Sequence, residues 1–320
     1  MKASLLFSML LACSIAFSHP GIGIVKDSKG NIFYSDLKHV WKIPAGGGQK
    51  TVVVHNVHTH ELHMDARDNL YGEHTWYNGE HLNTWGHYVW CLKSDGALVR
   101  VKDSTAGFLE NYSFVQDIEG NMYWVERWKV SRFKKKTPGG QITTIAEGKF
   151  RDVRWMHCTK DGVIYFLDLE KLYVLRNGKI TLLADDLAES TTAFSFVGER
   201  HNPYGLWTDA NENIYVAVFG GQLVKKITPS GKVTIFLHST SPWSPTSGVF
   251  DHQGNLWLQE YSITNDCRVR KIERASLAGQ QHNAAFMMND AFPFAVAAAV
   301  LLGIMVVLNP FPKQKATDPH

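Results

Sequence analysis

The chain has 320 residues, a formal net charge of +3 and an apolar fraction of 44%, which is enough for a sizeable core. Its Lys and Arg residues are scattered, so it lacks the basic stripe of nucleic-acid-binding proteins, and we exclude nucleic acid as a partner. Beyond the first 20 residues the cysteines are widely spaced and odd in number, which excludes a disulfide framework; small core roles are expected for Cys91, Cys158 and Cys267.

The first residues have the pattern of an export signal. A Lys follows the initiator Met, an apolar run extends to Phe17, and Ala16 and Ser18 are the small residues that signal peptidase requires. We therefore predict a signal peptide over residues 1–18. The alternative is acylation of Cys13, which follows Leu-Leu-Ala as in a lipoprotein processing site; we favour cleavage because the leader would otherwise be very short.

The body of the chain is repetitive. Each repeat has an Asp, two variable residues, Gly-Asn or a related pair, and then an apolar and aromatic strand. Asn and Gly tolerate the positive φ of a tight hairpin, and branched and aromatic residues suit a pleated sheet, so each repeat predicts a β-hairpin. The repeats begin 38 to 52 residues apart at Asp27, Asp65, Asp117, Thr159, Asp209 and Asp251.

A third and a fourth strand follow most hairpins, as at Leu223–Ile227 and Lys232–Phe236, so each unit is a predicted four-stranded sheet. Six such sheets of about 40 residues are best buried by radial packing around a channel. We predict an all-β, six-bladed β-propeller over residues 19–275. The sixth unit shows no fourth strand after Ile272, and the mature N-terminus before Gly21 is too short to supply one, so its closure stays open.

The C-terminal part has the pattern of a membrane anchor. After a linker at 276–290, residues 291–309 form an apolar segment near the lower length limit of a spanning helix. Two Lys residues lie in the tail at 310–320, and the positive-inside rule places this tail in the cytoplasm and the propeller on the periplasmic or extracellular side. The alternative is an apolar helix packed on the domain.

Two stretches resemble a known repeat family. Residues 201–215, beginning His-Asn-Pro-Tyr-Gly-Leu-Trp, and residues 244–257, beginning Ser-Pro-Thr-Ser-Gly, look like NHL-type repeats. They are also similar to the blades of virginiamycin B lyase and of the senescence-marker and gluconolactonase group. The resemblance implies the propeller fold over about residues 20–275. It leaves the chemistry open, because these families include metal-dependent lactonases, a lyase and binding modules.

The second repeat carries a candidate metal site. His58 and His60 are two apart on a strand and point to one face, as ligands of Zn²⁺, Mn²⁺ or Cu²⁺ would, and Glu73 or His74 could complete the site from the next strand. The acidic and amide ligands typical of the lactonases are replaced here by histidines. The alternative is that these polar side chains only hydrogen-bond across blades.

The other candidate site residues flank the innermost strands, at one mouth of the predicted channel. For a metal-assisted hydrolase or lyase, the predicted proton-transfer residues are His201, Glu126 and Glu260. The predicted substrate-binding residues are Arg154, Tyr204 and Tyr261. His63 and His157 replace Val or Trp of other repeats and are expected in the core.

The second hypothesis is a binding module without turnover. In that case the mouth recognises a small molecule, peptide, glycan or protein partner, and the long loop of the second repeat supplies aromatic contact area. The aromatic residues are Trp76, Tyr77, Trp85 and Tyr88.

Overall fold

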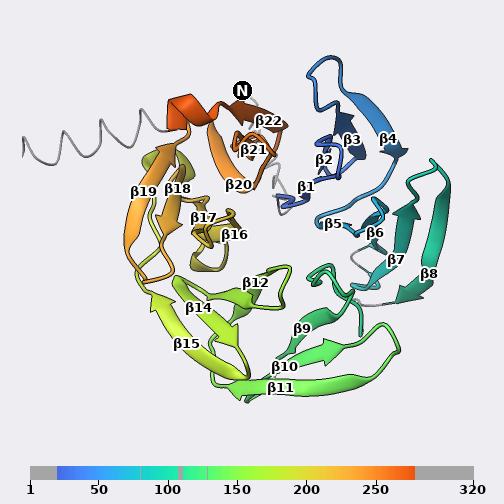
Figure 1. Ribbon diagram of the computed structural model, residues 1–320, viewed down its shortest axis with the longest axis horizontal. Coiled ribbons are helices and arrows are strands. Elements are labelled where there is room, and N and C mark those ends of the chain that lie inside the picture. Colours follow the sequence, from blue (N-terminus) through green and yellow to red (C-terminus); the bar gives the residue numbers. More distant parts are fainter. Residues whose placement is uncertain (1–19, 80, 107–110, 128, 278–320) are drawn as a thin grey trace, which may run out of the picture. The chain divides into compact units, whose positions relative to one another are not determined.

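The structure, a computed structural model, describes residues 20–79, 81–106, 111–127 and 129–277. Six antiparallel sheets follow one another along the chain and are arranged radially around a central channel (Figure 1). The compact unit that they form ends at Ile272. The prediction of an all-β, six-bladed propeller is therefore confirmed.

Within each blade the strands pair in sequence order, from the channel outward. The first three blades contain β1 (Ile24–Lys26), β2 (Ile32–Ser35), β3 (His39–Ile43) and β4 (Thr51–His55); β5 (Leu62–Met64), β6 (Leu70–Tyr77), β7 (Trp85–Leu92) and β8 (Leu98–Ala106); and β9 (Met122–Glu126), β10 (Ser131–Lys136) and β11 (Ile142–Gly148). The last three contain β12 (Val153–Cys158), β13 (Ile164–Asp168), β14 (Lys171–Arg176) and β15 (Lys179–Ala184); β16 (Pro203–Thr208), β17 (Ile214–Val218), β18 (Leu223–Ile227) and β19 (Val233–His238); and β20 (Trp243–Phe250), β21 (Leu256–Ser262) and β22 (Cys267–Ile272). Two short 3₁₀ helices, η1 (Thr192–Phe194) and η2 (Glu199–His201), precede β16.

The repeated Asp organises the hairpin of five blades through hydrogen bonds, and Thr159 takes its place in the fourth, where its hydroxyl accepts the Val163 N–H at 3.0 Å. In the fifth blade, Asp209 Oδ1 accepts the backbone N–H of Asn211 at 2.8 Å and that of Asn213 at 3.0 Å. Its Oδ2 accepts the Asn213 amide at 2.8 Å and the Tyr215 hydroxyl at 2.9 Å. The Asp, the Asn four residues later and the aromatic residue six residues later thus form one unit, which explains why they recur together.

Asp209→Ala is expected to lower the free energy of unfolding by about 2 kcal/mol, because several donors in the turn lose their acceptor together. Asp95→Ala is the matched control. Asp95 is exposed in the turn before β8, and its side chain accepts a hydrogen bond from the Ala97 N–H. Its replacement is therefore expected to lower the free energy of unfolding by less than about 0.5 kcal/mol. Urea denaturation measures both, and equal losses would show that the turn unit contributes little.

The third blade differs from the predicted four strands. Its innermost segment pairs through an isolated bridge between Gln116 and Met122 and is not a full strand. Here Ser113 competes with the ladder, since its hydroxyl accepts the Val115 N–H at 3.0 Å and its carbonyl accepts the Gln116 amide at 2.9 Å. Local side-chain bonds of this kind shorten the pairing that the repeat pattern predicts.

The sixth blade has three strands, which answers how the ring closes. No strand is shared between the sixth and first blades among the described residues; side chains join them instead. Lys26 Nζ donates to the Phe250 carbonyl at 2.5 Å, and the Gln259 amide and Tyr261 hydroxyl donate to the Ser35 carbonyl at 2.7 and 3.2 Å. The buried Tyr34 and Trp257 pack together at the same junction.

Several predictions fall outside the described residues: the signal peptide at 1–18, Cys13, most of the linker, the spanning segment at 291–309 and the tail at 310–320. In the part of the chain that the structure describes, no helix has the length and apolar character needed to cross a membrane. The three cysteines there are free, and each lies in a strand.

Candidate functional site

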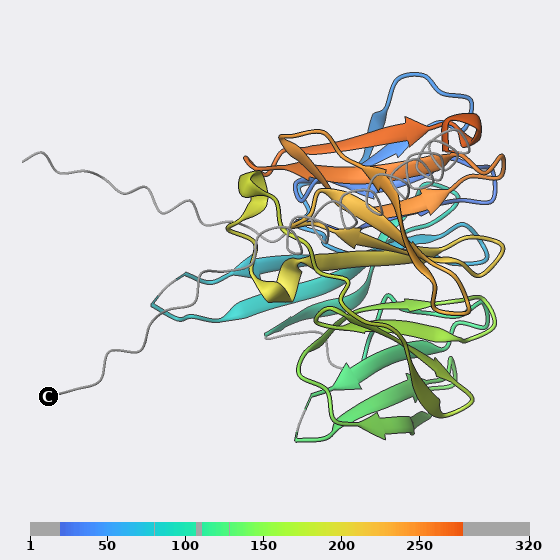
Figure 2. The same cartoon turned by 90° about the vertical axis from the view of Figure 1, so that its left-hand side faces the viewer.

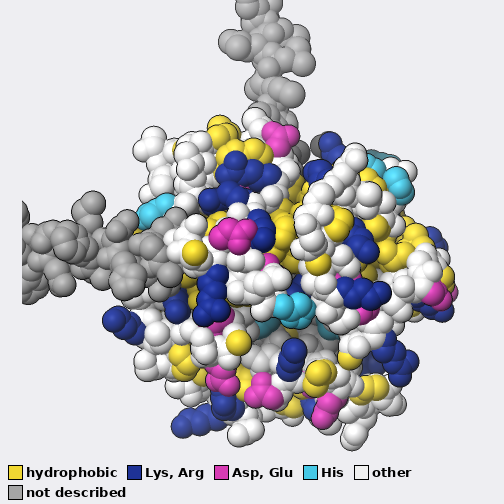
Figure 3. All heavy atoms as spheres, turned by 45° about the horizontal axis from the view of Figure 1, so that its top comes forward, with side chains coloured by type: hydrophobic (Ala, Val, Ile, Leu, Met, Phe, Trp, Pro, Cys, Tyr) yellow, Lys and Arg dark blue, Asp and Glu magenta, His cyan; other side chains and the backbone are white. Residues whose placement is uncertain are grey.

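Several of the predicted site residues, among them His60, Arg154 and His201, lie at the mouth of the channel where the innermost strands start. In the side view, the β6–β7 hairpin and the segment with η1 and η2 extend from the same face of the propeller (Figure 2). His60 and Glu61 directly precede β5, His201 ends η2, and Arg154 lies at the start of β12. On the face of Figure 3, Lys and Arg side chains are interspersed with Asp and Glu.

The second blade brings His58, His60, Glu73 and His74 together. The His58 and His60 rings lie 4.7 Å apart, and His60 Nδ1 is 3.5 Å from Glu73 Oε1. Glu73 Oε1 also accepts the His60 N–H at 2.6 Å, while His74 Nδ1 accepts the His58 N–H at 2.9 Å. Burial lowers the pKa of both His58 and His74, so these two imidazoles are neutral near pH 7.

These four residues do not form a metal-ligand set in this arrangement. His58 Nδ1 donates to the Leu37 carbonyl at 3.1 Å, so only its Nε2 could bind a metal. His74 Nδ1 accepts an N–H, so a neutral His74 carries its proton on Nε2 and has no lone pair to offer. No three His, Cys, Asp or Glu side chains of the described residues are grouped to hold an ion. The divalent metal stays a prediction, and the proton transfer proposed for Glu61 does not depend on it.

Two carboxylates form the most unusual pair at the mouth. Glu73 is buried, its Oε2 has no hydrogen-bond partner among the described residues, and its Oε1 accepts the Glu61 N–H at 3.4 Å. Burial and the neighbouring Glu73 raise the pKa of Glu61 from 4.5 to about 7, although His60 lowers it. A carboxyl that titrates near neutral pH can both accept and donate a proton.

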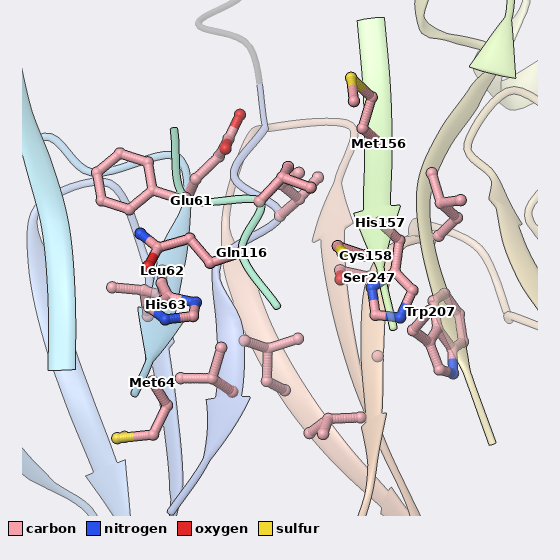
Figure 4. A pocket seen from close by; sticks show the side chains of 18 of the residues that line it. Glu61, Leu62, His63, Met64, Gln116, Met156, His157, Cys158, Trp207 and Ser247 are labelled. Atoms are coloured by element: carbon pink, nitrogen blue, oxygen red, sulfur yellow. The ribbon is translucent and has the colours of Figure 1, made fainter. Parts of the chain in front are cut away.

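Glu61 also lines a central cavity of about 340 Å³ to which all six blades contribute. Figure 4 shows its carboxylate pointing away from His63, toward one end of the cavity. His63 and His157, expected in the core, both line this cavity, and burial lowers the pKa of each to about 4, so both are neutral. The Trp207 indole N–H is buried there and has no hydrogen-bond partner among the described residues.

On blades three to five, arginines surround one acid. Arg154 Nε donates to Asp152 Oδ2 at 2.8 Å, and Arg200 Nε lies 3.0 Å from the same oxygen. Arg127, after β9, donates its Nε to the Val153 carbonyl at 2.9 Å. Arg154 is thus held in place at the mouth, as a predicted substrate-binding residue needs to be.

The two predicted substrate-binding tyrosines are core residues. Tyr204 is fully buried and its hydroxyl donates to the Pro20 carbonyl at 2.8 Å, while Tyr261 is fully buried and bonds Ser35. The Pro20 contact carries the N-terminal segment across to the fifth blade. Repeat position alone places a tyrosine near the mouth but does not show that its hydroxyl already has a partner inside the protein.

The three predicted proton-transfer residues have different surroundings. Glu260 is 0% exposed and holds an ion cluster within the sixth blade, accepting from Ser239 at 2.5 Å and from Arg268 and Arg270 at 2.8 and 3.2 Å. Glu126 is half-buried, 3.6 Å from Lys134 Nζ. The His201 ring lies 5.9 Å from the Tyr204 ring, at the mouth. The structure does not bring these three together.

The sequence analysis gave no role to Glu61, and it missed Arg127, Asp152 and Arg200. Glu61 adjoins His60 in a His- and Glu-rich stretch, which is the signal that could have identified it. The arginines come from three different blades, and no sequence spacing links them.

Comparison with known proteins supports the fold. No sequence-family description and no curated protein matches this chain. Solved structures do: a putative gluconolactonase (TM-score 0.52, 13% identity, covering 80% of this chain and 91% of that one) and a gluconolactonase from Xanthomonas campestris (0.51, 12%, 75% and 83%). Virginiamycin B lyase from Staphylococcus aureus also matches (0.46, 14%, 79% and 85%). The resemblance predicted from the repeats is therefore confirmed at the level of the fold.

Proposed function

We propose that this protein binds a small polar ligand at the channel mouth and acts on it as a hydrolase or lyase, with Glu61 as the proton-transfer residue. The observation that carries the proposal is the position of Glu61, which lines the cavity beside the buried Glu73. The pKa of about 7 that results for Glu61 suits general acid–base catalysis at neutral pH. Lyases and lactonases among propellers of this fold are consistent with such chemistry.

Glu61 can transfer the proton in either reaction class, hydrolysis or elimination. In hydrolysis, water attacks a carbonyl carbon while Glu61 accepts its proton, and the leaving oxygen receives that proton when its bond to carbon breaks. In elimination, Glu61 accepts a proton from carbon, the electron pair of that bond forms a carbon–carbon double bond, and the bond from the neighbouring carbon to the leaving group breaks. The leaving group departs with its electron pair and receives the proton from Glu61. Glu73 holds the N–H of His60 and of Glu61 in both cases, and so fixes the backbone that carries the base.

Export and membrane attachment are part of the proposal. The signal pattern at 1–18 and the apolar segment at 291–309 support a single-pass protein with its propeller on the periplasmic or extracellular side. The mouth would then meet ligands outside the cytoplasm.

Glu61→Gln is expected to lower kcat at least 100-fold on any substrate found among lactones and esters, because the amide cannot accept the proton. The wild-type pH–rate profile is expected to show an apparent pKa of about 7. Glu147→Gln, an exposed change on β11 paired with Arg132, is the control and should leave turnover unchanged. Turnover that persists in Glu61→Gln would refute the role. An EDTA arm, restored with Zn²⁺ or Mn²⁺, tests the predicted metal separately.

A second candidate function is binding through the β6–β7 hairpin. Tyr77 and Trp85 are 40% and 43% exposed, their rings lie 4.8 Å apart, and the hairpin projects from the face of the mouth (Figure 2). Adjacent, exposed aromatic rings fit the face of a sugar or an apolar peptide side chain. Absence of turnover on the whole panel, together with ligand binding that Trp85→Ala abolishes, would favour this function.

A further inference from the structure

The arginine cluster, Arg127, Arg154 and Arg200, is built from three blades around Asp152. The Asp152 side chain is only 9% exposed, and its Oδ2 is shared by Arg154 and Arg200. The Asp152 backbone N–H donates to Asp168 Oδ1 at 2.6 Å, and this bond holds the main chain of Asp152 in position. The shared carboxylate therefore sets the direction of two guanidinium groups before any ligand arrives.

Within the described part of the chain, each arginine of the cluster makes its polar contacts through Nε. Arg154 and Arg200 direct Nε to Asp152, and Arg127 directs it to the Val153 carbonyl. Among the described residues, the terminal Nη atoms of all three make no hydrogen bond. The Nη atoms of a guanidinium form a planar fork that matches carboxylate and phosphate oxygens.

Positive charge exceeds negative charge at this place. Three guanidiniums face two carboxylates, those of Asp152 and Asp168, and the next acids are paired elsewhere: Glu199 lies 3.2 Å from Arg151, and Glu126 lies 3.6 Å from Lys134. Burial lowers the pKa of Arg127; the Asp152 carboxylate opposes this shift, and Arg154 and Arg200 add smaller repulsions. Like charges held together in this way are stabilised by an anion.

The cluster lies close to the proposed proton-transfer residue. The charges of Arg154 and Glu61 both influence the pKa of the buried Tyr204 hydroxyl, Arg154 lowering it and Glu61 raising it. The Tyr204 ring centroid lies 4.4 Å from that of Trp155, the neighbour of Arg154. Arg154 and Glu61 therefore have Tyr204 as a common neighbour.

We propose that the arginine cluster binds an oxyanion group, carboxylate or phosphate, so that the ligand of this propeller is a small anion. This inference rests on the proposed function for the statement that the same ligand reaches Glu61. The anion site itself stands on the cluster alone, and the two can fail separately.

The test is isothermal titration of the full chain with inorganic phosphate and, separately, with succinate, at one ionic strength set with NaCl. Saturable binding of at least one anion is expected, and the stronger of the two identifies the oxyanion. Arg200→Ala is expected to weaken this binding about tenfold, since it removes a charge-assisted fork. Arg200 is 60% exposed on its side chain, so the variant should fold.

The control is Arg176→Ala, which removes an exposed arginine of the fourth blade paired with Glu212 at 3.4 Å, away from the mouth. Its binding should equal that of the wild type. Glu61→Gln should also keep anion binding, which separates this site from the proposed chemistry. Absence of saturable binding, or an equal loss in Arg200→Ala and Arg176→Ala, would overturn the anion site.

Discussion

Glu260→Ala is expected to lower the free energy of unfolding by about 3–5 kcal/mol, the largest effect among single changes at the predicted site. The Glu260 carboxylate has no exposed surface, and it accepts hydrogen bonds from Ser239, Arg268 and Arg270. Its removal leaves two guanidinium groups without their anion at the edge of the sixth blade. Chemical denaturation monitored by tryptophan fluorescence measures the loss.

Glu126→Ala is the matched comparison, since both acids were predicted to transfer protons. Glu126 is half-buried and lies 3.6 Å from Lys134 Nζ, so less than about 1 kcal/mol is expected for its removal. If Glu260→Ala were as stable as the wild type and had lost turnover, Glu260 would be catalytic and its structural role would be wrong.

Glu61→Gln is expected to make the protein more stable at pH 8 by roughly 3 kcal/mol, because each unit of the raised pKa corresponds to about 1.4 kcal/mol. The pKa of Glu61 is raised from 4.5 to about 7 in the folded protein, so folding favours the protonated form. The stability from this proton is fully present below pH 4.5 and is lost as the pH rises through 7. Gln resembles the protonated acid and does not titrate, so the advantage of the variant should vanish at pH 4.

Urea denaturation at pH 4 and pH 8 measures this difference, and Glu147→Gln serves as the control. Glu147 is exposed and paired with Arg132 on the surface, so its replacement should change stability little at either pH. A Glu61→Gln variant less stable than the wild type at pH 8 would mean that the ionised carboxylate is stabilised in the fold. Gains in stability on removing a catalytic group are typical of strained active sites.

The fold could be predicted because the hydrogen bonds of each repeat join residues that are close in the sequence. One Asp, one Asn and one aromatic residue within seven positions make a closed set of hydrogen bonds, as in Asp209, Asn213 and Tyr215. Five copies of the Asp–Asn turn, with Thr159 in the fourth unit, indicate a ring of six blades. The missing strand of the third blade could not be predicted in this way. It depends on whether the hydroxyl of Ser113 prefers its own backbone neighbour to the ladder.

The site was harder to predict because its chemistry depends on contacts between blades. Position in the repeat predicts that Tyr204, Tyr261 and Glu260 lie near one face, but burial and partners decide what each can do. The raised pKa of Glu61 comes first from burial and then from a second carboxylate twelve positions away, Glu73, which the β5–β6 hairpin brings beside it. No single-residue pattern carries that information.

The pKa of Glu61 is the most direct test of the proposed acid–base site. It can be measured by carbon-13 NMR of the full chain labelled at the Glu side-chain carboxyl carbons, with Glu61→Gln used to assign the resonance. A midpoint of about 7 is predicted. A midpoint near 4.5 would contradict a proton-transfer role at neutral pH, and would leave the mouth as a binding surface only.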